Sequence, residues 1–173
     1  MELRKAVFSG KSDDELMRFC IVSSDNDYKR FDWDSGKFYT ERLDIKGADV
    51  SELKTFFKDH APSVDNAIGA VTKTEIIDGE LFAFVRFASD ADSQKIAKKY
   101  EEGILSDVSI GYTISKLEKS DDIWTVRSFK IHELSAVWKG ADKGAKMRQC
   151  ERINEIHAQN LARKIKLKSK EIQ

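Results

Sequence analysis

The segment Leu81-Phe-Ala-Phe-Val-Arg-Phe87 constrains the fold most strongly, because it carries apolar residues on both faces for most of its length. Successive side chains of a strand point to opposite sides of a sheet, so a strand with one wet side alternates between apolar and polar residues. A strand that is apolar on both sides suits a closed or well-covered sheet better than one open to water. The segment therefore predicts a sheet whose two faces are both shielded.

Several other segments have strand composition and are separated by turn signals. Asp78-Gly79 is a hairpin signal between expected strands over 67–74 and 81–87. The remaining expected strands cover 16–23, 38–43, 107–115, 123–129 and 131–138. Helices are expected over 50–59, 89–102 and 147–165, the second capped by Ser89 and Gly103. This pattern predicts an α+β protein, a β-barrel or strongly curved, mostly antiparallel sheet of about seven strands with two to three flanking helices.

The chain of 173 residues suffices for one domain with a tail. We expect a loosely ordered N-terminal lead-in over 1–15, a main domain over 16–146 and a basic helical tail over 147–173. From Lys143 onward, nine Lys and Arg residues stand against three Glu residues, a difference of +6, although the net charge of the whole chain is zero. The basic charge therefore belongs to the tail, and a solvated helix end is its default interpretation.

Composition excludes several classes of protein. A net charge of zero gives no sign of a nucleic-acid partner. Cys20 and Cys150 lie far apart with no Cys-x-x-Cys or Cys/His cluster near them, which fits free thiols in a reducing compartment and predicts no metal or cofactor. No segment approaches the ~18 apolar residues of a membrane span, and the N-terminus lacks the apolar region of a signal peptide. We therefore expect a cytosolic protein that binds neither membrane nor nucleic acid.

The segment Asp107-Val-Ser-Ile-Gly-Tyr112 carries the clearest chemical signal. Its alternation places Ser109 and Gly111 on the polar face of a strand, where a missing side chain leaves room for a substrate. A serine hydroxyl becomes a nucleophile when a base lies within hydrogen-bond reach, and His60, just before the Pro62 loop, is the best candidate for that base. Without such a meeting, Ser109 is a packing residue and His60 a histidine at a helix end.

The third member of a catalytic set comes from His132-Glu133, which are adjacent on an expected strand and therefore face opposite sides. A carboxylate would orient His60 and stabilise its imidazolium form, which favours Glu133, while His132 stays open as the alternative. Ser106 and Ser115 are the nearby competitors of Ser109. His157 lies in the basic tail and is a weaker base candidate. Backbone N–H groups over 138–145, with Arg148, are the candidate donors to a developing oxyanion.

Five short blocks, taken in order, resemble the prohead (procapsid maturation) proteases of tailed bacteriophages, which are related in fold to the herpesvirus assemblin proteases. The blocks are Met17-Arg-Phe-Cys-Ile-Val-Ser-Ser24, Phe56-Phe-Lys-Asp-His60, Ala67-Ile-Gly69, Leu105-Ser-Asp-Val-Ser-Ile-Gly-Tyr112 and His132-Glu-Leu-Ser-Ala-Val137. Order and spacing carry the resemblance, which covers residues 16–146. The chain departs from it over 138–145, where many relatives have a Pro-Ala-Asn-Pro-like loop, so no oxyanion donors are carried over.

The resemblance implies an assemblin-like protease domain over 16–146. It implies a serine endopeptidase with Ser109 as nucleophile, His60 as general base and Glu133 as the acidic third member. Herpesvirus relatives use a second histidine in that role, which keeps His132 open. The implied substrates and partners are the phage major capsid protein, the scaffold and the chain itself, with self-association, inside the procapsid in the host cytoplasm.

Two other functions compete with this one. The first is a catalytically silent assemblin-like barrel that binds scaffold as a capsid-assembly factor. The second is a metal-dependent hydrolase that uses His60, His132 and acidic residues, although no His-x-x-x-His or comparable spacing supports it.

Overall fold

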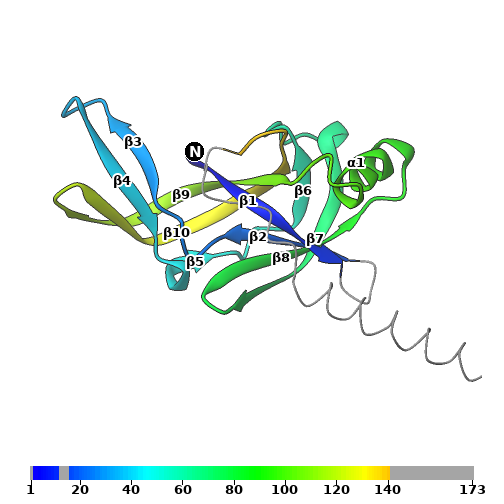
Figure 1. The fold of residues 1–173 in the computed structure, drawn as a ribbon, viewed down its shortest axis with the longest axis horizontal. Coiled ribbons are helices and arrows are strands. Elements are labelled where there is room, and N and C mark those ends of the chain that lie inside the picture. The colour runs from blue at the N-terminus through cyan, green and yellow to red at the C-terminus, as the bar shows by residue number, and fades with distance from the viewer. Residues whose placement is uncertain (1, 12–15, 141–173) are drawn as a thin grey trace, which may run out of the picture.

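The structure, a computed structural model, describes residues 2–11 and 16–140 (Figure 1). Within these ranges it contains ten strands, one α-helix and two short 3-10 helices. The strands are β1 (Glu2–Lys11), β2 (Met17–Val22), β3 (Tyr28–Asp32), β4 (Lys37–Leu43), β5 (Ala48–Asp49), β6 (Thr55–Lys58), β7 (Ala67–Ile77), β8 (Glu80–Phe87), β9 (Asp107–Ser120) and β10 (Ile123–Ala136). The helices are η1 (Ile45–Gly47), η2 (Val64–Asn66) and α1 (Ala91–Glu101).

The strands belong to one sheet, in which hydrogen-bonded neighbours follow the order β3-β4-β10-β6-β7-β8-β2-β1-β9. In addition, β5 pairs with β10, and β9 pairs with β10. Most pairings are antiparallel, whereas β10 runs parallel to β4, β5 and β6. The predicted α+β class is confirmed at this level: the described residues form a strand-rich sheet with one α-helix.

Strand β10 organises this sheet. Along one edge it pairs in turn with β4, β5 and β6, and along the other it pairs with β9 over nearly its whole length. Strands expected over 123–129 and 131–138 are therefore one continuous strand, because the pairing with β9 continues through Lys130 with local shifts of register. The strand count consequently differs from the predicted value of about seven, as β1, β3, β5 and β6 also add to it.

The helix expected over 50–59 was wrong. The backbone N–H of Leu53 donates to the carbonyl of Val50 at 3.0 Å in a turn, and β6 follows. Phe56 pairs with Leu134 of β10 on one side and with Gly69 of β7 on the other. Aromatic residues favour strands, and this two-sided pairing outweighs the helix-like spacing of the apolar side chains.

The N-terminal lead-in also differs from expectation, because Glu2–Lys11 forms β1 and pairs with both β2 and β9. Two local predictions were confirmed: Asp78 and Gly79 form the turn between β7 and β8, and α1 occupies most of the range expected for a helix. Its N-cap is Asp90, not Ser89; the Asp90 carboxylate accepts from the N–H groups of Asp92 and Ser93 at 3.1 and 2.9 Å. The helix expected over 147–165 lies outside the described residues.

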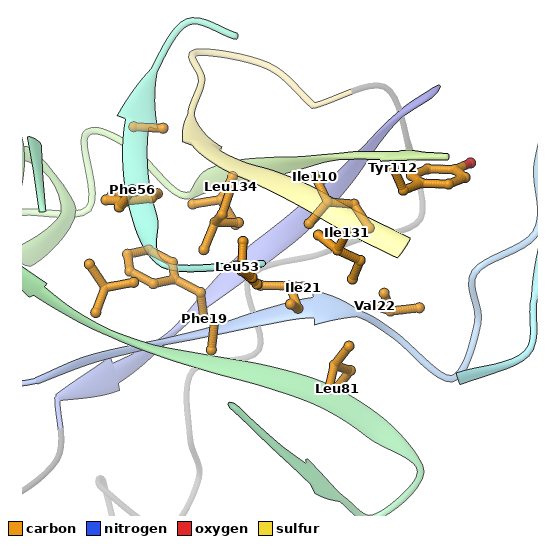
Figure 2. Close-up of a cluster of buried hydrophobic side chains, with 14 of the residues drawn as sticks. Phe19, Ile21, Val22, Leu53, Phe56, Leu81, Ile110, Tyr112, Ile131 and Leu134 are labelled. Atoms are coloured by element: carbon orange, nitrogen blue, oxygen red, sulfur yellow. The ribbon is translucent and has the colours of Figure 1, made fainter. Parts of the chain in front are cut away.

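The hydrophobic core determines which faces of β9 and β10 point inward. Figure 2 shows Phe19 of β2, Phe56 of β6, Ile110 of β9 and Leu134 of β10 directed into one cluster, and each of these side chains is fully buried. Burying a side chain of this size contributes roughly 1.5–3 kcal/mol to the free energy of unfolding. Because Ile110 and Leu134 face the core, the residues on either side of them in β9 and β10 face away from it. In the part of the chain that the structure describes, no helix is long and apolar enough to cross a membrane.

Candidate active site

Four residues on the outward faces of β9 and β10 form what we call the site row: Ser109, Gly111, Glu133 and Ser135. Ser135 pairs directly with Ser109, and Glu133 pairs with Gly111. Residues that pair directly across antiparallel strands have side chains on the same face, with Cβ atoms about 4.5–5.5 Å apart. Although this face points away from the main core, the side chains are covered: Ser109 is 1 %, Glu133 2 % and Ser135 0 % exposed.

His60 reaches the site row from the neighbouring strand. Strand β6 runs parallel to β10 with Phe57 paired to Ser135, and beyond its end the N–H of Asp59 still donates to the carbonyl of Ala136 at 2.9 Å. The backbone then turns sharply, because Asp59 and His60 have φ angles of 55° and 53°. Two consecutive non-glycine residues in the left-handed region are unfavourable, and such backbone strain is often found at functional sites.

That turn brings His60 and Glu133 into direct contact, although 73 positions separate them in the sequence. The distance from His60 Nδ1 to Glu133 Oε1 is 2.9 Å. A carboxylate is an acceptor, so the proton of a neutral His60 ring lies on Nδ1, and Nε2 is left as the basic nitrogen. The side chain of His60 is 20 % exposed while that of Glu133 is 2 % exposed, so the pair connects the buried row to the surface.

Ser135 makes a second contact with the same carboxylate. Its Oγ donates a hydrogen bond to Glu133 Oε1 at 2.5 Å, so this single oxygen accepts from both Ser135 and His60. Burial alone raises the pKa of Glu133, but the hydrogen bonds from His60 and Ser135 and the attraction of a protonated His60 outweigh it and hold the pKa below the ordinary value. Glu133 is therefore a carboxylate at neutral pH.

Two buried oxygens of the site row, Ser109 Oγ and Glu133 Oε2, have no hydrogen-bond partner among the residues that the structure describes. Buried polar groups are nearly always hydrogen-bonded, and an unpaired one costs about 1–3 kcal/mol, so exceptions call for an explanation. The structure thus places Ser109 on the same face as the His60–Glu133 pair and on an adjacent strand, but it does not form the Ser109–His60 hydrogen bond.

The residues that competed for roles are separated from this arrangement. His132 makes separate contacts at the surface: its ring nitrogens lie 3.0 Å from Glu52 Oε2 and 3.0 Å from Thr113 Oγ1. Ser106 Oγ donates to Asp107 Oδ1 at 2.8 Å, and Ser115 is exposed further along β9. A shift of register between Ile131 and Glu133 interrupts the alternation of β10, so adjacency does not place His132 and Glu133 on opposite faces as expected. His132 contacts Thr113 on the face of β9 that carries Ser109, and it is Glu133 that His60 meets.

The expected oxyanion donors lie mostly beyond the described residues. Residues 141–145, Arg148 and His157 fall outside them, while the N–H of Gly140 donates to Asp107 Oδ2 at 2.9 Å. That hydrogen bond ties the segment after β10 to the start of β9, two residues before Ser109. Sequence reasoning missed this tie and the contact of Ser135 with Glu133, although the two-residue spacing of Glu133 and Ser135 already places them on one face.

No group of three or more His, Cys, Asp or Glu side chains that could hold a metal ion occurs among residues 16–140. Comparisons with protein-family models, with curated proteins and with solved structures found no match to this chain. The case for a function therefore rests on the geometry of the site row and on the resemblance of the sequence blocks.

Proposed function

We propose that this chain is a serine endopeptidase of phage capsid maturation in which Ser109 is the nucleophile, His60 the general base and Glu133 the residue that orients His60. The observation that carries the proposal is the 2.9 Å contact between His60 Nδ1 and Glu133 Oε1 on the face of the sheet that also carries Ser109. A histidine in the turn after β6, a carboxylate on the adjacent β10 and a serine on β9 supply the parts of a catalytic triad.

The strand pairings support the finer part of the fold prediction, an assemblin-like barrel or strongly curved sheet. Pairing runs from β10 through β6, β7, β8, β2 and β1 to β9, and β9 pairs again with β10. Such a path gives each of these seven strands two neighbours. It also accounts for Leu81–Phe87, which lies in β8 between β7 and β2 and is largely buried.

The proposed chemistry follows from the tautomer of His60. Ser109 Oγ attacks the carbonyl carbon of the scissile peptide while His60 Nε2 takes the hydroxyl proton, and Glu133 stabilises the imidazolium that forms. The proton then passes to the leaving amine, and the acyl group stays on Ser109. Water attacks this ester with His60 as base, which releases the new carboxyl terminus and restores the serine hydroxyl.

This cycle requires a rearrangement. Ser109 Oγ is buried without a partner among the described residues, so the hydroxyl and the imidazole have to come within about 2.6–3.2 Å before proton transfer. Catalytic hydrogen bonds are often long in free enzymes and tighten when substrate binds. We place this approach of the Ser109 hydroxyl to the His60 imidazole in the step in which substrate binds at the site row.

The proposed substrates are the scaffold and the major capsid protein of a phage, and the chain itself, inside the assembling procapsid in the host cytoplasm. This part rests on the block resemblance. Proteases that act on their own assembly partners need a means of delaying cleavage, and a nucleophile that is covered in the free chain is compatible with such a delay.

One observation favours a second candidate. Because Ser109 is 1 % exposed and not bonded to His60, the chain could serve as a catalytically silent assemblin-like barrel that binds scaffold during capsid assembly. The same residues would then be structural. The two candidates differ in whether Ser109 is chemically activated.

Labelling with a fluorophosphonate probe distinguishes them. An activated Ser109 Oγ forms a bond to phosphorus with loss of fluoride, which intact-mass and peptide mass spectrometry locate on one residue. We expect one adduct on Ser109 that is absent in Ser109→Ala and lost in His60→Ala, whereas Ser115→Ala, which removes an exposed serine of the same strand, labels normally. If the folded chain takes no adduct, both alone and with scaffold and capsid protein present, the silent role is correct.

A further inference from the structure

The carboxylate of Glu133 is held asymmetrically. Its Oε1 accepts hydrogen bonds from His60 Nδ1 at 2.9 Å and from Ser135 Oγ at 2.5 Å, while Oε2 has no partner within the described part of the chain. A carboxylate has two equivalent oxygens and turns readily about its last bond, so His60 alone does not determine which oxygen faces the ring or in what orientation. Ser135 supplies the second fixed point.

The position of Ser135 is itself rigid. It is 0 % exposed, and it lies between Phe57 of β6 and Ser109 of β9 in the paired strands. Glu133 precedes it by two positions on the same face of β10, so the short distance between the two side chains follows from strand geometry. The serine hydroxyl therefore holds the carboxylate relative to a backbone that is hydrogen-bonded on both edges.

We propose that Ser135 is a positioning residue of this site: its hydroxyl fixes the Glu133 carboxylate so that Oε1 holds the proton of His60 on Nδ1 and leaves Nε2 free to act as base. The inference deepens the proposed function, since it concerns the same base, but the arrangement of protons that it asserts exists in the free chain. Ser135 acts here through Glu133 and not as a second nucleophile, because its hydroxyl donates to the carboxylate that orients the base and not to the base itself.

The charge state of Glu133 supports the assignment. Burial raises the pKa of Glu133, and the hydrogen bonds from His60 and then Ser135 lower it. When the Ser135 hydroxyl is removed, one of the hydrogen bonds that lower the pKa is lost while the effect of burial remains. The pKa of Glu133 therefore rises. A carboxylate that is less firmly ionised and free to turn holds the His60 proton on Nδ1 less completely.

Nitrogen NMR of the histidine rings in the full chain tests this directly, because protonated and unprotonated ring nitrogens give well-separated signals. The three histidines are assigned with His60→Gln, His132→Gln and His157→Gln. We expect wild type to show His60 with its proton on Nδ1, Ser135→Ala to shift those signals toward the other tautomer, and the carboxyl carbon of Glu133 to titrate at higher pH in Ser135→Ala. Ser128→Ala, a serine of β10 outside the site row, is the matched control and leaves both readouts at their wild-type values.

Unchanged His60 signals and an unchanged Glu133 titration in folded Ser135→Ala overturn the proposal. Should Ser135→Ala fail to fold, Ser135→Cys, which is similar in size and a weaker donor, must shift both readouts in the same direction to a smaller extent, and a null result there is equally decisive.

A labelling arm separates this inference from the proposed function. If Ser109 is activated, the maximal rate of fluorophosphonate labelling falls roughly 10-fold in Ser135→Ala, as expected for loss of one hydrogen bond to a charged group, while the half-saturating probe concentration is unchanged. Absence of any adduct in wild type counts against the protease and leaves the NMR result standing. A normal labelling rate in Ser135→Ala, with wild type active, counts against Ser135.

Discussion

Ser109 and Ser135 face each other across β9 and β10, yet their hydroxyls are in opposite states. Ser135 Oγ donates to Glu133 at 2.5 Å, whereas Ser109 Oγ is buried with no partner among the described residues. The proton of Ser135 is therefore held by the carboxylate, while the hydroxyl of Ser109 is free to turn toward a base that comes within reach.

Glu133→Gln removes the negative charge while keeping the size of the side chain. The amide no longer stabilises an imidazolium, and its NH₂ group can favour the wrong tautomer of His60. We expect the fluorophosphonate labelling rate of Ser109 to fall by about 10²–10⁴-fold, the range that a positioned base contributes. Glu75→Gln, at an exposed position of β7, is the control and should label at the wild-type rate; equal rates for the two variants would remove Glu133 from the mechanism.

The stability of the chain should depend on Glu133 in acid. Because burial is outweighed by the His60 and Ser135 hydrogen bonds, the pKa of Glu133 in the folded chain lies below its ordinary value of 4.5. Its contribution to the free energy of unfolding is therefore complete above about pH 4.5 and is lost as the pH falls through the folded pKa. Urea unfolding of wild type and Glu133→Gln at a series of pH values measures the difference between their free energies of unfolding. We expect a difference at pH 7 that becomes smaller below about pH 4.5. A difference in free energy of unfolding that stays constant with pH would contradict the lowered pKa of Glu133.

His132→Gln distinguishes the two candidates for the third position. His132 contacts Glu52 and Thr113 at the surface, so loss of its ring removes exposed polar contacts. We expect labelling of Ser109 within twofold of wild type and a loss of stability of less than about 1 kcal/mol, measured by thermal unfolding. Abolished labelling in a folded His132→Gln would instead assign the third position to His132.

Asp59→Val tests whether the left-handed turn positions His60. Asp tolerates a φ of 55°, whereas a β-branched residue does not, so the substitution should lower the free energy of unfolding by about 1–2 kcal/mol and displace the ring of His60. Labelling of Ser109 should fall with it. Asp59→Gly removes the same carboxyl but accommodates the turn, and retention of labelling there would attribute the effect to backbone conformation and not to charge.

Several features of the site follow from the sequence. The alternation over Asp107–Ile114 predicts that Ser109 and Gly111 share a face. The turn at Asp78-Gly79 and the helix that ends before Gly103 are local signals that the structure bears out. All of these depend on periods of two or on residues close together in the chain.

Features that depend on distant segments were not predictable in this way. The helix-like spacing of Leu53, Phe56 and Phe57 suited either a helix or a strand, and pairing with β10, about 80 residues away, decided it. The polar segment Glu2–Lys11 becomes a strand because β2 and β9 both offer it hydrogen-bonding edges. Likewise, the left-handed turn at His60 contains no glycine that would indicate it in the sequence. The approach of His60 to Glu133 therefore could not be predicted from residue types.

The parallel pairing of β6 with β10 also fixes when the site is completed. In a growing polypeptide, His60 and Ser109 leave the ribosome before Glu133, and β6 has no partner on that edge until β10 has emerged. Long-range parallel pairing is slow because the intervening chain has to be ordered first. The His60–Glu133 contact can therefore form only after Glu133 has left the ribosome, later than the segments that carry His60 and Ser109.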